Sequence, residues 1–335
     1  METSIQSKLY YNGWEVVETT SFFLYMIIGG RGIGKTYSIL KGLLESDSKF
    51  MYVRRTDVEM KNCCKEVNNP FLTLNEDLGR NVEMKKNEDS YVIIEEENIL
   101  GLGGSLSTFG KFRGSDFSMI DYIIFDEFIS TTPYSKIKDE ADLFFNMIET
   151  VMRNREINGK KPIKIIMLSN SNSLDNGIIK ELKLGEIIRQ MKINKEQEYI
   201  DTNRNIYLCL PSGLGITEKK KETALYKLTK GTSFFEMSLN NEFTSDNFDD
   251  VKKIPVNMLI PLFSYENITF YEVKNKDYIY CSYRKADCIK YTKENVNMLK
   301  KDYGMLLFYH IESKLIRYFN YDVKLEVLSI FWLTL

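Results

Sequence analysis

Residues 22–36 read FFLYMIIGGRGIGKT, an apolar run followed at once by a glycine-rich turn and then by Lys35 and Thr36. The apolar run Phe22–Ile28 has the length and composition of a buried strand, and the residues after it predict a helix from Gly34 to Glu45. A glycine-rich turn between a strand and a helix presents backbone N–H groups and the positive end of the helix dipole, which together suit phosphate groups. The stretch therefore predicts a P-loop at the edge of an α/β sheet.

The turn satisfies the whole Walker A pattern. The nucleotide-binding residues expected from it are Gly29, Gly30, Arg31, Gly32, Ile33, Gly34, Lys35 and Thr36. Lys35 would contact the β- and γ-phosphates of ATP, and the Thr36 hydroxyl would ligate Mg²⁺. The alternative is a glycine-rich turn with an incidental lysine, and the strand before it and helix after it argue against that alternative.

A second apolar run, Tyr122–Phe125, ends in two acids, Asp126 and Glu127. Ligands of open α/β sheets bind where the strands end, so Asp126 is expected to hold the metal ion and Glu127 to polarise the attacking water. Small GTPases instead need Asp-x-x-Gly here and a later Asn-Lys-x-Asp, and neither pattern occurs. The two motifs together predict an ATPase with Lys35 and Glu127 as catalytic residues.

The remaining apolar patterns in the first two-thirds alternate between strand and helix, as in a largely parallel sheet. Expected strands are 49–54, 163–168 and 206–210, with hairpin-like segments over 81–108; expected helices are 57–67 and 139–155. The strand 163–168 runs into Ser169 and Asn170. Such polar residues beside a Walker B strand can sense the γ-phosphate, or they can simply form a turn.

Phosphoryl transfer also needs positive charge near the transferred group, often an arginine from a neighbouring subunit. Arg153 ends the helix 139–155, and Arg113 precedes the Walker B strand. Arginines at a helix C-terminus are favoured by the helix dipole in any case. The residues alone therefore leave both arginines open, and Arg54 and Arg55 could serve the same role or form salt bridges.

Composition limits the other classes of function. The formal net charge of −2 lacks the strong basic excess of proteins that coat nucleic acid. Five cysteines without paired spacing and a single histidine argue against a zinc site and suit a reducing compartment. The apolar end, Val327–Leu335, is too short to span a membrane, so we expect it to be a packed strand or helix.

Several blocks together resemble the DNA-packaging ATPase of small, short-tailed, protein-primed bacteriophages, a branch of the terminase large-subunit superfamily. The blocks that carry the resemblance are Gly29–Tyr37, Tyr52–Arg55, Ile124–Ile129, Arg153–Glu156, Leu168–Asn170 and the lid-like Gly231–Leu239. They extend in order over roughly residues 8–243, and after 245 the match is faint.

The resemblance implies a P-loop ATPase domain of the ASCE/RecA-like class over 1–205, a linker or lid over 206–244, and a C-terminal domain over 245–335. That last domain would be a small α+β unit resembling a degenerate RNase H-like nuclease. The resemblance makes Arg153 the trans-acting finger, Arg113 a second trans-acting basic residue, and Ser169 with Asn170 the coupling motif. Nuclease chemistry needs clustered carboxylates, and the strands near 268–273 and 278–282 offer Glu272 and little else, so no nuclease activity is expected.

The resemblance further implies a homomeric ring, a pentamer, that drives double-stranded DNA into a prohead. Expected partners are the DNA, other copies of the chain, the portal of the prohead and, as a further candidate, a structural packaging RNA. The expected place is the host cytoplasm, with transient docking on the prohead and no membrane contact. A helicase-like nucleic-acid ATPase and a nucleotide-gated assembly scaffold are the alternatives, although the second half lacks the Gln-x-x-Gly-Arg-x-x-Arg block of two-lobed helicases.

Overall fold

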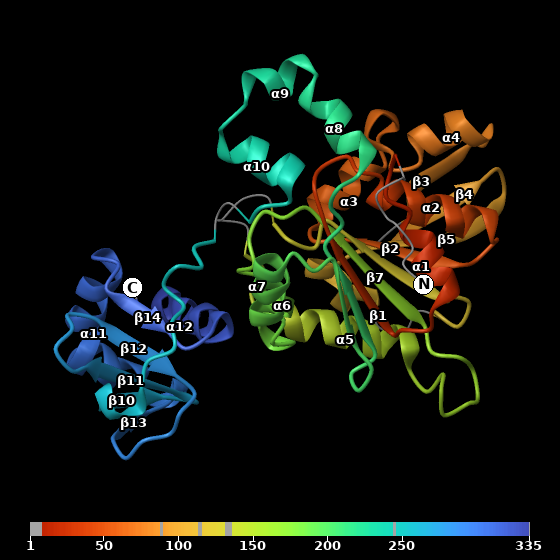
Figure 1. The fold of residues 1–335 in the computed structure, drawn as a ribbon. Coiled ribbons are helices and arrows are strands. Elements are labelled where there is room, and N and C mark those ends of the chain that lie inside the picture. The colour runs from red at the N-terminus through yellow and green to blue at the C-terminus, as the bar shows by residue number, and fades with distance from the viewer. Residues whose placement is uncertain (1–8, 88–89, 113–115, 131–135, 244–245, 335) are drawn as a thin grey trace. The chain divides into compact units, whose positions relative to one another are not determined.

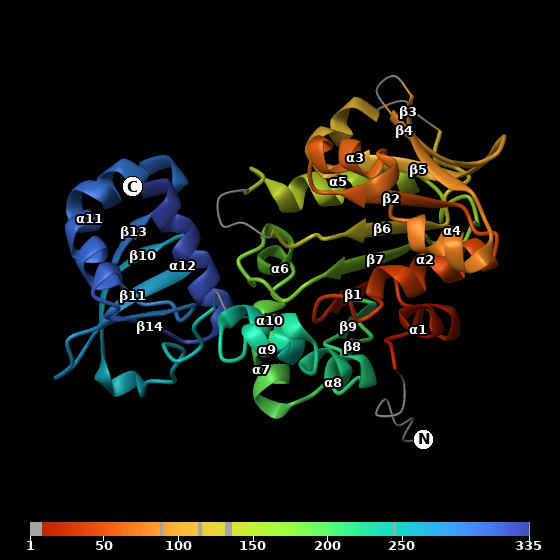
Figure 2. The same cartoon turned by 90° about the horizontal axis from the view of Figure 1, so that it is seen from above.

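The computed structural model of the chain describes residues 9–87, 90–112, 116–130, 136–243 and 246–334. By internal contacts the chain forms two compact units, residues 1–178 with 195–245, and residues 179–194 with 246–335. Figures 1 and 2 show both units as ribbons. Each is described by itself below, as unit 1 and unit 2.

Unit 1 is built on one large sheet. In the described residues its strand order is β3-β4-β5-β2-β6-β7-β1-β9-β8. The bounds are β1 Leu24–Ile28, β2 Phe50–Arg54, β3 Val82–Asn87, β4 Ser90–Glu95, β5 Asn98–Ser105, β6 Tyr122–Asp126, β7 Lys164–Ser169, β8 Glu198–Asp201 and β9 Ile206–Cys209. The strands from β5 to β9 in this order pair in parallel, and antiparallel hairpins form both edges. The expected mainly parallel sheet is confirmed.

Helices accompany the strands of unit 1. The bounds are α1 Gly13–Thr19, α2 Lys35–Glu45, α3 Asp57–Cys63, η2 Glu66–Asn68, α4 Leu72–Leu78, η3 Leu106–Phe112, α5 Glu140–Met152, α8 Gly215–Lys221, α9 Ala224–Leu228 and α10 Ser233–Asn240. The short helix α6, Gly177–Glu181, begins in unit 1 and ends in unit 2. Ile124 of β6 belongs to the core cluster with Ile39 and Leu40 of α2. Phe125, the next residue, faces the other way and stacks on Phe144 of α5. Because both faces of the central strands are covered, these strands are apolar throughout.

Two expected helices are shorter than predicted. The pattern over 57–67 divides into α3, which begins with a Thr56–Glu59 capping box, and the short turn η2. Val67 is largely exposed, so a longer helix would bury no further apolar side chain there. The helix expected over 139–155 is α5, which ends at Met152 because Arg153 adopts φ 44° and leaves the helical region.

Unit 2 contains a five-stranded mixed sheet in the described residues, ordered β13-β10-β11-β12-β14. Its elements are α7 Gly185–Asn194, η4 Val256–Met258, β10 Leu259–Tyr265, β11 Ile268–Val273, β12 Ile279–Ser282, β13 Ile289–Tyr291, η5 Lys293–Asn295, α11 Val296–Glu312, β14 Ile316–Tyr318 and α12 Tyr321–Thr334. The strands β10, β11 and β12 are antiparallel neighbours, and β13 and β14 pair in parallel outside them. The expected packed C-terminal segment is the end of α12, in which Val327 is buried.

Residues 179–194 join unit 2 although they lie early in the chain. The first turns of α7 and α12 cap each other, because Glu186 accepts a hydrogen bond from the Tyr321 backbone N–H and Asp322 accepts one from the Glu186 backbone N–H. The approach is close: a Cβ on Gly185 would lie 2.8 Å from Asp322 Oδ1. Among the helices described, none has the length and hydropathy needed to cross a membrane.

Candidate nucleotide site

The ends of four neighbouring strands bring the candidate residues to one edge of the sheet. In the order β2-β6-β7-β1 these ends carry Arg54, Asp126, Ser169 and, just after Ile28, Gly29. The register aligns Ile28 with Ser169 and Asp126 with Leu168. The carboxyl ends of parallel strands are where open α/β sheets bind ligands, and a cavity of about 230 Å³ opens at this edge.

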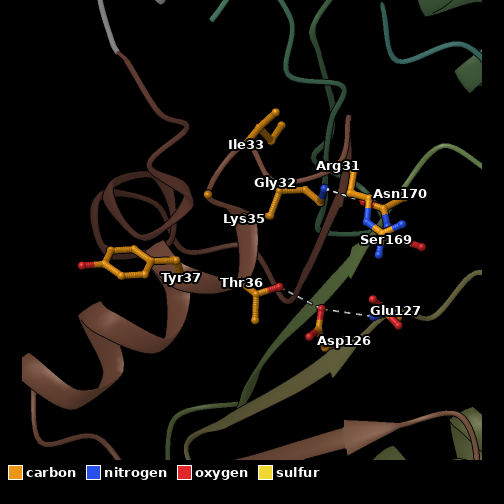
Figure 3. Close-up of a pocket in the computed structure, with 11 residues that line it drawn as sticks. Arg31, Gly32, Ile33, Lys35, Thr36, Tyr37, Asp126, Glu127, Ser169 and Asn170 are labelled. Carbon is orange, nitrogen blue, oxygen red and sulfur yellow. Dashed lines mark hydrogen bonds between the residues drawn. The ribbon is translucent and has the colours of Figure 1, made fainter. Parts of the chain in front are cut away.

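The glycine-rich turn wraps one side of the cavity (Figure 3). Gly34 is the N-cap of α2 and has φ 100°, a conformation that residues with a side chain rarely adopt. Gly30 is closely covered, since a Cβ there would lie 2.5 Å from the backbone oxygen of Ser238. Of the expected Walker A residues, those that line the cavity are Arg31, Gly32, Ile33, Gly34, Lys35 and Thr36.

Lys35 is buried at the start of α2, and its ammonium bridges two of the predicted motifs. Nζ donates hydrogen bonds to the backbone oxygens of Gly29 (3.0 Å) and Gly30 (2.7 Å) and to Oδ1 of Asn170 (3.1 Å). Burial lowers the pKa of Lys35 to about 8, and the nearby Asp126 opposes that shift. A polyanion in the cavity would favour the charged ammonium.

Thr36 and Asp126 both line the cavity and contact each other there. The Thr36 hydroxyl donates to Asp126 Oδ1 at 3.0 Å, and the Tyr52 hydroxyl donates to Oδ2 at 2.7 Å. A hydroxyl and a carboxylate are hard oxygen donors of the kind that Mg²⁺ prefers. The donor set therefore fits a magnesium ion, with Tyr52 orienting the carboxylate from behind.

Glu127 follows directly, with φ 53°, and its side chain is 42% exposed. Arg54 forms an ion pair with Glu127 and reaches Asp126 Oδ2 at 3.4 Å. Burial alone would lower the pKa of Arg54, but the nearby Tyr52, Asp126 and Glu127 together outweigh it and raise that pKa above its ordinary range. Among the residues described, Arg54 Nε is buried without a hydrogen-bond partner.

The pair Ser169 and Asn170 lies between the two motifs in space. Ser169 Oγ accepts a hydrogen bond from the Ile129 backbone N–H (3.2 Å), just after the two acids, and Asn170 contacts Lys35 as described. The next residue, Ser171, donates to the backbone oxygen of Met237 on α10. This strand end thus touches the Walker A lysine, the segment after Walker B and the helix α10.

Arg153, the first arginine expected to act in trans, does not line this cavity. Arg153 is exposed at the end of α5, where φ 44° and ψ −130° are strained for a residue with a side chain. Arg155 nearby holds the local turn instead, through Asp121 and the backbone oxygens of Ile120 and Lys161. Arg113 lies outside the described residues.

Sequence reasoning left the roles of two contributors unassigned. Tyr52 stood only within a block that carried the family resemblance, and an aromatic residue in a buried strand is usually core. Arg54 was one of four candidate arginines, and its pairing with Glu127 depends on β2 lying beside β6, which local sequence does not specify.

The comparisons with known proteins identify the family of the chain. The family model for podovirus DNA encapsidation protein (Gp16) matches residues 5–329. The DNA packaging protein of Bacillus phage B103 is 31% identical over 229 residues, 67% of this chain and 65% of that protein. That of Bacillus phage phi29 is 26% identical over 248 residues, 72% of this chain and 68% of that protein.

The matched region thus spans about two thirds of the length of these curated relatives. Among solved structures, the bacteriophage Phi-29 viral genome packaging motor assembly aligns with a TM-score of 0.66 at 19% identity, over 98% of this chain and 100% of that one. At such identity the likeness shows a shared fold. Since the family model covers nearly the whole chain, the chain belongs to the podovirus DNA encapsidation protein (Gp16) family.

Proposed function

We propose that this chain hydrolyses ATP to drive double-stranded DNA into a phage prohead. The observation that carries the proposal is the convergence of Lys35, Thr36, Asp126 and Glu127 on one cavity, in a chain of a DNA encapsidation family. The strand β7 lies between β1 and β6, which supports an ASCE/RecA-like class of P-loop domain. The helicase and scaffold alternatives gain no support from the family.

ATP would bind with its phosphates in the turn Gly29–Thr36, where backbone N–H groups and the start of α2 supply positive potential. Lys35 would contact the β- and γ-phosphates. Thr36 and Asp126 would hold Mg²⁺, which when bound neutralises phosphate charge and orients the γ-phosphate. The proposed binding residues are those of the whole Walker A turn, including Arg31, Gly32 and Ile33.

Glu127 is the proposed base that orients the attacking water. Arg54 forms an ion pair with its carboxylate, so Glu127 can act on water only after that ion pair opens. A triphosphate in the cavity would compete for the Arg54 guanidinium and so free Glu127. Ser169 and Asn170 are the proposed coupling residues, because they contact the Walker A lysine and the segment after Walker B. The next residue, Ser171, contacts α10.

In a ring, a neighbouring subunit would supply a further positive charge to the transferred phosphate. Arg153 lies exposed at the end of α5 and outside the cavity lining, so its placement suits donation to the site of a neighbouring subunit. We propose Arg153 as the finger and Arg113 as a second trans-acting residue, in a homopentamer. A ring would also place several copies of the chain around the DNA. Because one chain has a net charge of −2, it would bind a polyanion weakly by itself.

Unit 2 is the proposed docking part, with the portal or prohead and a structural RNA as candidate partners. Its antiparallel β10-β11-β12 with flanking parallel strands supports the idea of a degenerate RNase H-like fold. We propose that it has no nuclease activity. The functional division into a P-loop domain (1–205), a lid (206–244) and a docking domain (245–335) belongs to this proposal, as does action in the host cytoplasm.

The first test is steady-state ATP hydrolysis at high protein concentration with no DNA, with single-stranded DNA and with double-stranded DNA, each with and without proheads. We expect stimulation mainly by double-stranded DNA. Stimulation mainly by single strands would indicate a helicase-like enzyme. Absence of turnover under all conditions would contradict the ATPase.

The trans role of Arg153 needs mixed assemblies. Arg153→Ala subunits should regain hydrolysis when mixed with Lys35→Ala subunits, which cannot hydrolyse ATP but still offer Arg153. Lys160→Ala, which removes an exposed charge from the following turn, should hydrolyse ATP without any mixing. Failure of rescue in assemblies shown to contain both variants would count against a trans finger.

A further inference from the structure

The helix α8 carries three consecutive lysines, and the middle one reaches the Walker A turn. Lys220 Nζ donates hydrogen bonds to the backbone oxygens of Arg31 and Gly32, the latter at 3.1 Å. The approach is so close that a Cβ on Gly32 would lie 2.8 Å from Nζ. A residue 188 positions away in sequence therefore supplies a cation to the rim of the phosphate cavity.

The two neighbouring lysines behave differently. Lys219 is exposed, and Lys221 pairs with Glu218 on its own helix at 2.7 Å. Lys220 is partly buried; burial, and secondarily the charge of Arg31, lower its pKa. Its position is thus set by the fold and differs from that of an ordinary solvated lysine.

The segment that carries Lys220 is attached to the site at other points as well. Asn241, at the end of α10, donates to the Ile28 backbone oxygen (3.1 Å), just before the glycine-rich turn. Ser238 covers Gly30, and Met237 accepts a hydrogen bond from Ser171. The helices from α8 to α10 therefore form a lid whose contacts end on the Walker A turn and beside the coupling residues.

We propose that Lys220 is a phosphate-binding residue that the lid supplies in cis, and that it senses the γ-phosphate of bound ATP. Its ammonium donates hydrogen bonds to two neutral carbonyl oxygens, whereas an ionised phosphate is a stronger acceptor. The flexible stem of a lysine allows the ammonium to turn from the outer rim to the terminal phosphate. Movement of Lys220 would carry α8, and with it the lid, when the γ-phosphate arrives or leaves.

This inference rests on the proposed nucleotide site and gives it a specific property, discrimination between ATP and ADP. Arg31 and Gly32 line the cavity, and in this proposal the cation bound to their carbonyls acts on the last phosphate more than on the inner ones. Lys35, in contrast, contacts Gly29, Gly30 and Asn170 and is expected to serve both nucleotides. Loss of Lys220 should therefore separate the two affinities.

The test measures the dissociation constants of ADP and of the non-hydrolysable analogue AMP-PNP, by competition with a fluorescent nucleotide. The variants are Lys220→Ala, Lys220→Gln and Lys220→Arg, with Lys219→Ala and Lys221→Ala as matched controls on the same helix. We expect Lys220→Ala and Lys220→Gln to weaken AMP-PNP about tenfold or more, as for loss of a charged hydrogen bond. The affinity for ADP should change by no more than about twofold, as should both affinities in the controls.

Lys220→Arg should keep most of the discrimination, because it keeps the charge. Equal weakening of both nucleotides would overturn the inference and show that Lys220 only shapes the Walker A turn. Unchanged affinity for AMP-PNP in well-folded Lys220→Ala would overturn it as well. If the wild-type protein bound neither nucleotide, the proposed function itself would fail.

Discussion

Arg54 and Arg55 are neighbours at the end of β2, yet they lie in two different environments. Arg54 pairs with two residues that line the cavity, Asp126 and the partly exposed Glu127. Arg55 faces the interior and is 3% exposed. It pairs with the buried Glu140 and donates to the Phe128 backbone oxygen at 2.7 Å.

The interior network has its hydrogen-bonding groups paired with one another. Glu140 Oε2 accepts hydrogen bonds from Asn176 Nδ2 (3.0 Å) and from the Gly177 backbone N–H (3.1 Å). It therefore joins the segment after Walker B to the start of α5 and the start of α6. A charge network of this kind is costly to break from one side, because the remaining charge stays buried.

The comparison shows that two adjacent residues of the same type can have different roles, one at the candidate site and one in the core. Successive residues of a strand point to opposite faces. Arg54 therefore contacts residues that line the cavity, whereas Arg55 points into the core. On the cavity side the ion pairs can be exchanged for ligand contacts. On the core side the ion pair connects the segments that support the cavity.

The largest effect is expected on the cavity side, from Glu127→Gln. Loss of a catalytic base should lower ATP turnover by about 10²–10⁴-fold. Its free energy of unfolding should change by less than about 1 kcal/mol, because the Glu127 side chain is 42% exposed. Turnover is measured under DNA-stimulated conditions and stability by urea unfolding. Near wild-type turnover would remove Glu127 from the mechanism.

On the core side, Glu140→Ala should lower the free energy of unfolding by about 3–5 kcal/mol. Urea unfolding can be followed through Trp14 of unit 1 in a Trp332→Phe background, since the chain has only two tryptophans. The double variant Arg55→Met, Glu140→Leu should recover much of the loss, because it leaves no unpaired charge. A Glu140→Ala protein as stable as wild type would show that the two sides do not differ as argued.

The sequence predicted which residues meet at the cavity better than it predicted the residues that support them. Both motifs and the coupling pair have local signatures, namely a glycine-rich turn, two acids after an apolar strand, and small polar residues after another. Parallel strands bring such ends to one edge of a sheet, so their meeting could be inferred. The contacts of Arg54, Tyr52 and Lys220 depend on strand order and lid packing, which local patterns do not encode.

The same reason explains what was missed in unit 2. The helix α7 looks like an ordinary amphipathic helix, and nothing in its sequence indicates α12 as its partner. Glu186 and Asp322 are suitable capping residues, but each caps a helix more than a hundred positions away. Reciprocal contacts at such distance leave no periodic signal in one sequence.

On the cavity side, a smaller effect is expected from pH on the affinity for ADP. In the free protein the pKa of Lys35 is lowered to about 8, so above that pH the amine must take up a proton when phosphate binds. The dissociation constant of ADP should therefore rise by up to about tenfold per pH unit above pH 8. Lys35→Arg, whose guanidinium stays charged, should bind with little pH dependence. A flat wild-type profile up to pH 10 would contradict this view of Lys35.

The smallest effect is expected from Lys41→Ala on the solvent face of α2, the helix that begins with Lys35 and Thr36. Lys41 pairs with Glu45 at 3.7 Å, and both side chains are well exposed. Such a pair contributes about 0.3–0.5 kcal/mol, so unfolding, ADP affinity and turnover should all stay close to wild type. Because Lys41 and Lys35 share a helix, this variant tests whether α2 transmits any perturbation to the cavity. A loss of ADP affinity in Lys41→Ala would show that a change on the solvent face of α2 reaches the cavity. The cavity side and the core side of β2 could then not be treated as separate.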